Sequence, residues 1–148
     1  MAAARSFGDR EQGRVYSVRP AAYAVIQDSD GHIACVGESS GLFLPGGGTR
    51  AGEAPEETLA REVREECAFE VMQCTPLYSA VQFFVSGEGI AYELQAAFFR
   101  THFGPATASV PELLLRFLSA EKAMRRLFHE CHRWAVEVAL GRSEHTRV

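Results

Sequence analysis

The segment from residue 46 to residue 69, GGGTRAGEAPEETLAREVREECAF, most constrains how this chain can fold. Three glycines lead into a sequence that is typical of a helix and carries Glu62, Glu65 and Glu66. Because an α-helix turns by about 100° per residue, Glu62 and Glu66 lie one turn apart on one face, with Glu65 beside them. Like charges at this spacing repel by about 0.2–0.5 kcal/mol per pair, so this face needs either full solvation or a cation.

The glycines favour the cation. Taken alone, the run of charges has a simpler explanation, which is a solvated acidic helix face. Glycines just before the helix, however, let backbone carbonyl groups approach the point where the carboxylates meet. Mg²⁺ takes oxygen ligands, usually one or two carboxylates together with waters and substrate phosphates. The segment therefore predicts a metal site.

The helix itself is predicted from local signals. Pro55 suits the first helical position, because its missing N–H is no loss there. The apolar face that would pack inward consists of Leu59, Ala60, Val63 and Cys67. The carboxylates lie beside this face rather than opposite it, which puts them at the edge of the core. Arg61 can pair with Glu57 and Glu65, four residues away on either side, and hold the acidic side chains in place.

The rest of the chain predicts strands around this helix and a second one. Strands are expected at residues 22–27, 33–37, 41–44, 69–84, 90–100 and 113–118. A turn from Asp28 to Gly31 would join the first two strands as a hairpin, and another turn is expected at residues 86–89. Ser119 can cap a helix that runs to about Leu140. These elements predict an α/β fold with a mixed sheet covered on both sides.

Length and composition predict one domain inside the cell. A chain of 148 residues is expected to form a single domain over residues 16–148, preceded by a polar, loose arm at residues 1–15. The first residues contain no apolar core of a signal peptide, and no apolar run is long enough to span a membrane. The four cysteines, which form no CxxC pair, are expected to be reduced packing residues in the cytoplasm.

The charge balance argues against large anionic partners. The net charge is −4, which disfavours broad binding to a nucleic-acid polymer or to a membrane surface. A small phosphorylated substrate stays compatible with this balance, because a metal ion would carry the compensating charge.

The same segment resembles a known family motif. Starting at Gly47, the residues are G, five others, Glu53, seven others, Arg61-Glu62-Val63, one other, Glu65-Glu66, one other, and Ala68-Phe69. This order is similar to the Nudix box of the MutT-like Nudix hydrolases, G-x5-E-x7-R-E-U-x-E-E-x-G-U, where U is aliphatic. Ala68 replaces the late glycine, and the aromatic Phe69 takes the last aliphatic position. The resemblance implies the α/β/α sandwich of that family.

The resemblance also implies an activity and a ligand set. Nudix enzymes hydrolyse a nucleoside diphosphate linked to another moiety, with Mg²⁺ or Mn²⁺ and water. By position in the motif, the metal ligands would be Glu62, Glu66, the carbonyl of Gly46, and Glu65 either as a ligand or as a partner of metal-bound water. Arg61 and Glu53 would orient these acids.

The general base is left open among several glutamates. Glu65 or Glu66 could accept the proton of the attacking water, but the family often uses an acid from a later loop. Glu112 is the first candidate of that kind, and Glu88 is the second. Clustered carboxylates titrate as a coupled set, so the sequence selects no single base. Arg50 and Arg100 are candidate contacts to the substrate phosphates.

Ala68 is the main departure from the motif. The family glycine falls just past the helix, where a left-handed conformation is common, and alanine costs about 1 kcal/mol in that conformation. Either the helix ends differently or the strain is tolerated. Activity is expected to survive, because the metal ligands precede this residue.

The substrate and some weaker features stay open. Residues 83–87 carry neither the proline that is frequent in ADP-ribose hydrolases nor the tyrosine of diadenosine polyphosphate hydrolases. A MutT-like nucleoside triphosphate pyrophosphatase remains by default. The alternatives are a nucleotide-binding or regulatory Nudix module with little turnover, and a structural metal-binding domain. A homodimer is possible by family analogy.

Aromatic and histidine side chains offer weaker signals. The side chains that could stack a base are Phe83, Phe84, Phe98, Phe99 and Trp134, for which core packing is the favoured alternative. His129, Cys131 and His132 could suggest zinc, but core or surface histidine is favoured because the three do not share one helix face.

Overall fold

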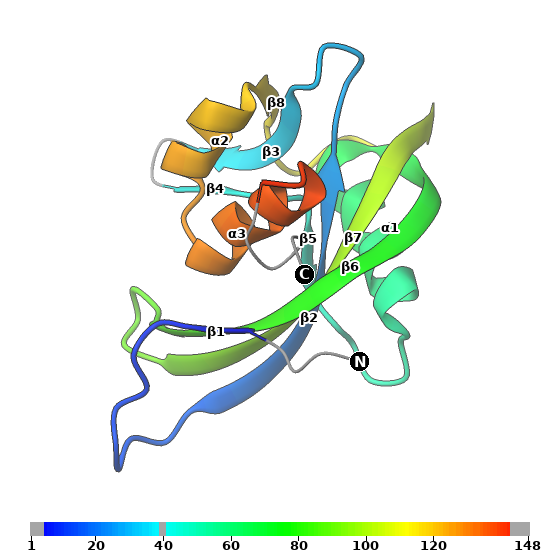
Figure 1. Cartoon of the computed structure of the whole chain (residues 1–148). Coiled ribbons are helices and arrows are strands. Elements are labelled where there is room, and N and C mark those ends of the chain that lie inside the picture. The colour runs from blue at the N-terminus through cyan, green and yellow to red at the C-terminus, as the bar shows by residue number, and fades with distance from the viewer. Residues whose placement is uncertain (1–4, 39–40, 143–148) are drawn as a thin grey trace.

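Eight strands and three helices form over residues 5–38 and 41–142, the part of the chain that the computed structural model describes (Figure 1). The strands are β1 (Arg5–Phe7), β2 (Ser17–Ile26), β3 (Ile33–Glu38), β4 (Gly41–Phe43), β5 (Gly46–Gly48), β6 (Phe69–Val85), β7 (Ala91–Ala106) and β8 (Leu115–Leu118). The helices are α1 (Pro55–Cys67), α2 (Ala120–Arg126) and α3 (Glu130–Ala139).

The strands form two sheets. The larger is mixed and has the order β1-β6-β7-β2-β5, in which β2 runs parallel to β7 and β1 runs parallel to β6. Its other neighbours, β6 with β7 and β2 with β5, are antiparallel. The smaller sheet is antiparallel with the order β4-β3-β8.

Strand β2 explains why the larger sheet is covered on both faces. Its residues from Ala21 to Ile26 are all buried, and successive side chains of a strand point to opposite faces. One core holds Ala21, Tyr23 and Val25 with Trp134 and Val138 of α3, and the other holds Ala22, Ala24 and Ile26 with Leu59, Val63 and Cys67 of α1. Helices α1 and α3 therefore cover opposite faces of the sheet (Figure 1), which confirms the predicted α/β/α sandwich.

The predicted hairpin at residues 22–37 is wrong in its pairing. The chain does turn there, since the Gly31 amide donates to the carbonyl of Asp28 and Gln27 bridges to Ile33. Beyond that single bridge β2 and β3 diverge, because β2 pairs with β7 and β5 while β3 pairs with β4 and β8. The turn therefore connects two sheets.

The single C-terminal helix expected up to about Leu140 is also wrong. Ser119 caps α2 as predicted, its hydroxyl accepting from the Lys122 amide at 3.2 Å. The helix then ends at Leu127, whose backbone is extended, and α3 begins only after His129. Within the break, the Phe128 amide donates to the carbonyl of Leu42 at 2.8 Å, so the segment pairs with β4 instead of continuing the helix.

The N-terminal arm is not loose over its whole described length. Arg5–Phe7 forms β1, which pairs in parallel with Ala80 to Gln82 of β6. The ring of Phe7 lies 5.7 Å from that of Trp134, measured between centroids. Residues 1–4 of the expected arm lie outside the described residues. All four cysteines are free, and three of them are buried, as expected for packing residues. No helix in the described ranges is long and apolar enough to cross a membrane.

Candidate active site

The acidic helix begins at the residue that its sequence predicts, but one of its predicted ion pairs does not form. Pro55 is the first residue of α1, and the Glu57 carboxylate accepts from the Ala54 amide at 2.9 Å. Glu57 thereby satisfies a backbone donor that the helix leaves free. The predicted pair between Arg61 and Glu57 is therefore wrong, and Arg61 reaches toward the glycine strand instead.

Arg61 holds the acidic side chains together. Its guanidinium lies 2.6 Å from the Glu53 carboxylate, 2.9 Å from that of Glu62 and 3.5 Å from that of Glu65. It also donates to the carbonyl of Gly48 at 2.9 Å. This hydrogen bonding holds the pKa of Glu53 down to about 2. With its donors engaged in this way and its side chain only 15% exposed, the Arg61 guanidinium is held against these carboxylates.

The glycines of β5 are required because neighbouring groups approach their Cα atoms too closely for a side chain to fit. The Glu62 carboxylate lies directly against Gly47, where an added Cβ would be 2.6–2.8 Å from its carboxylate atoms. Gly46 has a φ of +144°, and a Cβ there would clash with the carbonyl oxygen of Ala22. The three-glycine run therefore lets the acids of α1 lie against the backbone of β5.

Among these acids, Glu66 has the least of its negative charge balanced by a basic side chain. It accepts from the Gly46 amide at 2.9 Å, and it forms no ion pair with any described residue. Burial raises the pKa of Glu66 to about 8 despite that hydrogen bond, and the charges of Glu62, Glu112 and Glu65 add to the rise. Burial also raises the pKa of Glu62. The site thus carries more negative charge than Arg61 balances.

Glu112 joins the site through the backbone. The loop before β8 donates its Glu112 amide to the carbonyl of Glu65 at 3.0 Å, and the next amide, that of Leu113, to the carbonyl of Glu66 at 3.2 Å. These bonds satisfy carbonyls at the end of α1 that have no partner within the helix. Glu88, by contrast, is exposed in the turn between β6 and β7 and makes no hydrogen bond or ion pair with these acids among the described residues.

Ala68 adopts the left-handed conformation of the glycine that it replaces. Its φ and ψ are 60° and 38°, and its amide donates to the carbonyl of Arg64 at 3.0 Å. The Thr107 amide donates to its carbonyl at 2.8 Å. The helix therefore ends as the motif requires, and of the two alternatives it is the tolerated strain that holds.

The two candidate phosphate contacts are placed differently. Arg50 is exposed at the edge of the acids, 3.8 Å from the Glu65 carboxylate. Arg100 hydrogen-bonds the carbonyl of Ala139 at the end of α3, on the opposite face of the sheet from α1. The structure thus corrects the expectation for Arg100, because the guanidinium is held away from the acids.

A pocket of about 370 Å³ opens beside the acids, with Glu66 and Gly46 in its lining. Its other lining residues include Arg19, Tyr23, Phe43, Phe84, Phe128 and His129. Sequence reasoning misses Arg19, favours core packing for Phe84, and treats His129 as a core or surface histidine. Nothing in the local sequence pattern marks these residues as neighbours, because they come from segments far apart in the chain.

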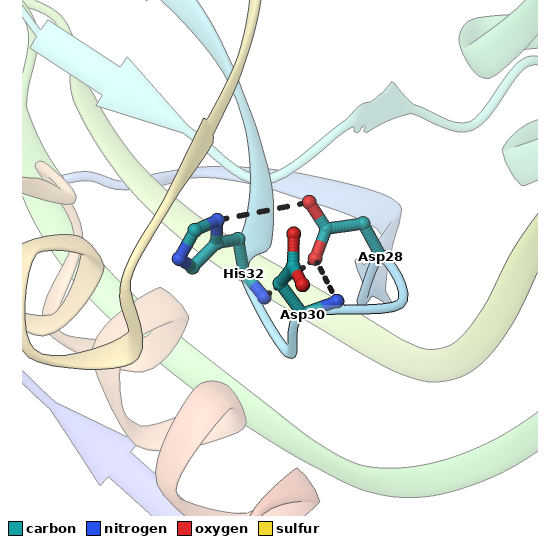
Figure 2. Close-up of side chains that lie close together, drawn as sticks. All are labelled: Asp28, Asp30 and His32. Atoms are coloured by element: carbon teal, nitrogen blue, oxygen red, sulfur yellow. Dashed lines mark hydrogen bonds and ion pairs between the residues drawn. The ribbon is translucent and has the colours of Figure 1, made fainter.

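A second acidic group lies on the turn between β2 and β3. Ligand atoms of Asp28, Asp30 and His32 all lie within 4.8 Å of one another (Figure 2). The turn accounts for this closeness, because the Asp28 carboxylate accepts from the amides of Asp30 and His32 at 3.0 and 2.8 Å. This group is separate from the acids of α1.

The glycine strand, the acidic helix and the adjoining pocket lie together at one end of β5 and α1. The chain belongs to the Nudix family: the family model described as NUDIX domain matches residues 17–99, more than half of its length. Comparison with curated proteins found no match.

Solved structures share the fold. A NUDIX hydrolase from Nitrosomonas europaea has a TM-score of 0.67 at 14% identity, with 84% of this chain and 90% of that chain covered. A MutT NUDIX hydrolase from Burkholderia pseudomallei has a TM-score of 0.64 at 23% identity, with 82% and 98% covered. The dihydroneopterin triphosphate pyrophosphohydrolase of E. coli has a TM-score of 0.63 at 17% identity, with 86% and 99% covered.

Proposed function

We propose that this enzyme hydrolyses the pyrophosphate bond of a nucleoside diphosphate linked to another moiety, with Mg²⁺ or Mn²⁺ as cofactor. The observation that carries the proposal is the uncompensated carboxylate of Glu66. It lies partly buried beside Glu62, Glu65 and Glu112, and its pKa is raised to about 8. A buried acid among like charges favours a cation as its partner.

The donor set fits a hard divalent cation. Glu62, Glu65, Glu66 and the carbonyl of Gly46 would hold it, and they offer oxygen atoms only, which suits Mg²⁺ and Mn²⁺ rather than softer metals. When bound, the cation would shield phosphate charge and lower the pKa of a water molecule. Arg61 and Glu53 would keep the carboxylates in place, since Arg61 pairs with Glu53, Glu62 and Glu65.

Glu112 is the proposed acceptor of the water proton, with Glu65 as the alternative. Glu112 is exposed, while its amide is anchored to the carbonyl of Glu65, so its side chain stays near the acids yet free to accept a proton. The attacking oxygen would form its new bond to phosphorus, and the bridging oxygen would leave with the second phosphate. Arg50, at the edge of the acids, would contact the substrate phosphates.

The substrate class is proposed to be a small nucleotide. The pocket beside Glu66 has the size of sites for small ligands, roughly 300–1,000 Å³. A nucleoside triphosphate is the first candidate, since residues 83–87 lack the proline and the tyrosine typical of the ADP-ribose and diadenosine polyphosphate hydrolases. We further propose that residues 16–148 act as one domain in the cytoplasm, as a monomer or a homodimer, without nucleic-acid polymers or membranes as partners.

The test is a substrate panel with matched variants. The protein is incubated with Mg²⁺ or Mn²⁺ and with nucleoside triphosphates, nucleotide sugars and dinucleotides, in H₂¹⁸O so that the position of bond cleavage is read from the product. Glu66→Gln should lower kcat/KM by about 100-fold or more, since even outer partners of a metal site are worth 10–100-fold. Glu56→Gln, an exposed glutamate in the first turn of the same helix, is the control and should leave it unchanged.

Two results would contradict the proposal. Absence of turnover on every substrate, with Mn²⁺ binding intact by calorimetry, would exclude the hydrolase. Turnover that Glu66→Gln leaves unchanged would exclude the assignment of the acids.

A further inference from the structure

One polar side chain in the pocket has no role in the proposed reaction. His129 precedes α3, yet its side chain does not cap that helix. The residue is only 6% exposed, and its ring makes no hydrogen bond with any described residue. Because His129 lines the pocket, its imidazole is available to a ligand there. A buried polar group without a protein partner normally has another one, either water or a ligand.

Three phenylalanine rings surround the imidazole: those of Phe43 and Phe84 on two strands, and that of the preceding residue Phe128. The imidazole centroid lies 4.7 Å from that of Phe84 on β6 and 5.0 Å from that of Phe128, both in edge-to-face geometry. The ring of Phe43 on β4 is 5.6 Å away. All three line the same pocket, and Phe128 is 54% exposed, which is high for a phenylalanine. The imidazole is therefore fixed in place by apolar rings that themselves face the pocket.

His129 is an uncharged hydrogen-bonding group in this setting. Burial lowers its pKa to about 4, and the charge of Arg133 adds to the effect. A neutral imidazole offers one donor and one acceptor. His132 lies behind it, with ring centroids 5.1 Å apart, and accepts from the Leu44 amide through Nδ1 at 3.1 Å. That bond leaves the proton of neutral His132 on Nε2, so the second ring is also fixed.

We propose that His129 is the specificity-determining residue that hydrogen-bonds the base of the nucleotide, while Phe43, Phe84 and Phe128 pack against the base. The inference rests on the proposed function for the position of the phosphates beside Glu66. A flat heterocycle with polar groups on its edge matches aromatic walls and a neutral donor–acceptor such as the imidazole of His129. A sugar offers no flat π-face to stack on these phenylalanine rings, whereas every base does.

The matched variants are His129→Phe, which keeps an aromatic ring and removes both nitrogens, and Phe128→Ala, which removes an exposed ring. Binding of the four common nucleoside 5′-monophosphates and of ribose 5-phosphate is measured by calorimetry with Mg²⁺ present. The wild type should prefer at least one base over ribose 5-phosphate by tenfold or more. His129→Phe should reduce that preference by about 10- to 100-fold, and Phe128→Ala should weaken all bases alike.

Steady-state kinetics on nucleoside triphosphates separate the two proposals. His129→Phe should change the ratio of kcat/KM values between bases, mainly through KM. Base preference that depends on His129 without any hydrolysis would keep the inference and overturn the proposed function. Hydrolysis with the same base ratios in wild type and variant would do the reverse. Where His129→Phe does not fold, His129→Asn takes its place: unchanged base ratios with it overturn the inference, and an altered order of bases supports it.

Discussion

At the scale of single residues, Ala68 shows how a local strain is accommodated at the end of the acidic helix. An L-residue other than glycine pays about 1–2 kcal/mol in the left-handed region. Backbone hydrogen bonds on both sides of Ala68, to Arg64 and from Thr107, hold it there. The strain lies after the acids, so it lowers stability without displacing them.

Replacing Ala68 by glycine should remove this strain. Ala68→Gly is expected to raise the free energy of unfolding by about 1 kcal/mol, which corresponds to roughly 2–4 °C in Tm. Ala60→Gly, inside the same helix, is the control and should destabilise by about 1 kcal/mol, because glycine is a poor helix former there. Thermal unfolding measures both. A fall in Tm for Ala68→Gly would contradict the account.

The raised pKa of Glu66 predicts a pH-dependent stability of the metal-free protein. The folded pKa of about 8 exceeds the ordinary value of 4.5, so the folded state holds the proton more tightly. The resulting stabilisation is complete below pH 4.5 and is lost as the pH rises through about 8. A tenfold difference in proton affinity between the folded and unfolded states is worth about 1.4 kcal/mol.

Glu66→Gln should therefore remove most of that loss. In EDTA, chemical denaturation of the wild type should show a lower free energy of unfolding at pH 8.5 than at pH 5.5, relative to the variant, by more than about 1 kcal/mol. Adding Mg²⁺ at pH 8.5 should restore the wild type and leave the variant unchanged. Parallel pH profiles of the two proteins would show that Glu66 does not hold this proton.

Substitutions of Glu112 and Glu88 test which residue is the general base. Glu112→Gln should lower kcat by roughly 100-fold or more, as expected on loss of a general base, with little change in KM. Glu88→Gln is the matched control, since Glu88 is exposed in the β6–β7 turn, and it should have full activity. Steady-state kinetics on the best substrate of the panel measure both. Full activity of Glu112→Gln would move the role to Glu65.

The acids of α1 could be predicted from their local spacing. The rest of the site could not, because its contacts join residues that are far apart in the sequence. Glu62, Glu65 and Glu66 follow from helical geometry, and Gly46 lies only 20 residues from its partner Glu66. The position of Arg100 could not be predicted, because its partner Ala139 is 39 residues away and leaves no trace in the local pattern. The contacts of His129 with Phe43 and Phe84 could not be predicted for the same reason, because these rings come from distant parts of the chain.

At the scale of elements, the break between α2 and α3 decides where the pocket lies. No glycine or proline occurs from Leu127 to His129, so the periodic pattern predicts one continuous helix. The break forms because Phe128 pairs with the carbonyl of Leu42, and the Arg133 guanidinium donates to the carbonyls of Leu127 and Phe128 at 2.7 and 3.2 Å. A tertiary contact therefore overrides a local preference for helix.

Arg133→Ala should loosen this break. Two carbonyl groups lose their partner, and hydrogen bonds from a charged group are worth about 1.5–3 kcal/mol each in favourable cases, so a loss of about 1–2 kcal/mol in unfolding free energy is expected at this partly exposed site. The KM for nucleotide should rise more than kcat falls. Arg125→Ala, an exposed arginine of α2, is the control. Equal KM values in wild type and both variants would separate Arg133 from the pocket.

At the scale of the whole molecule, one strand organises both cores. The six consecutive buried residues of β2 supply alternate side chains to the core under α1 and to the core under α3. A shift of this strand by one residue would exchange the two sets. The sandwich could be predicted from the number and order of elements. The division into two sheets could not, because the β2–β3 turn looks the same in a hairpin and in a connection between sheets.

The two sides of the pocket depend on contacts of very different sequence separation, which affects the order in which they can form. The acids need only the chain between Gly46 and Glu66, whereas Leu44 meets His132 across 88 residues. Contacts over such a span form late, because closing the long loop costs entropy before it is rewarded. During synthesis, the emerging chain can thus assemble its cation ligands well before it can tell one base from another. We therefore expect base selectivity to be acquired after the cation ligands are assembled, and to be the first property that a shortened C-terminus removes.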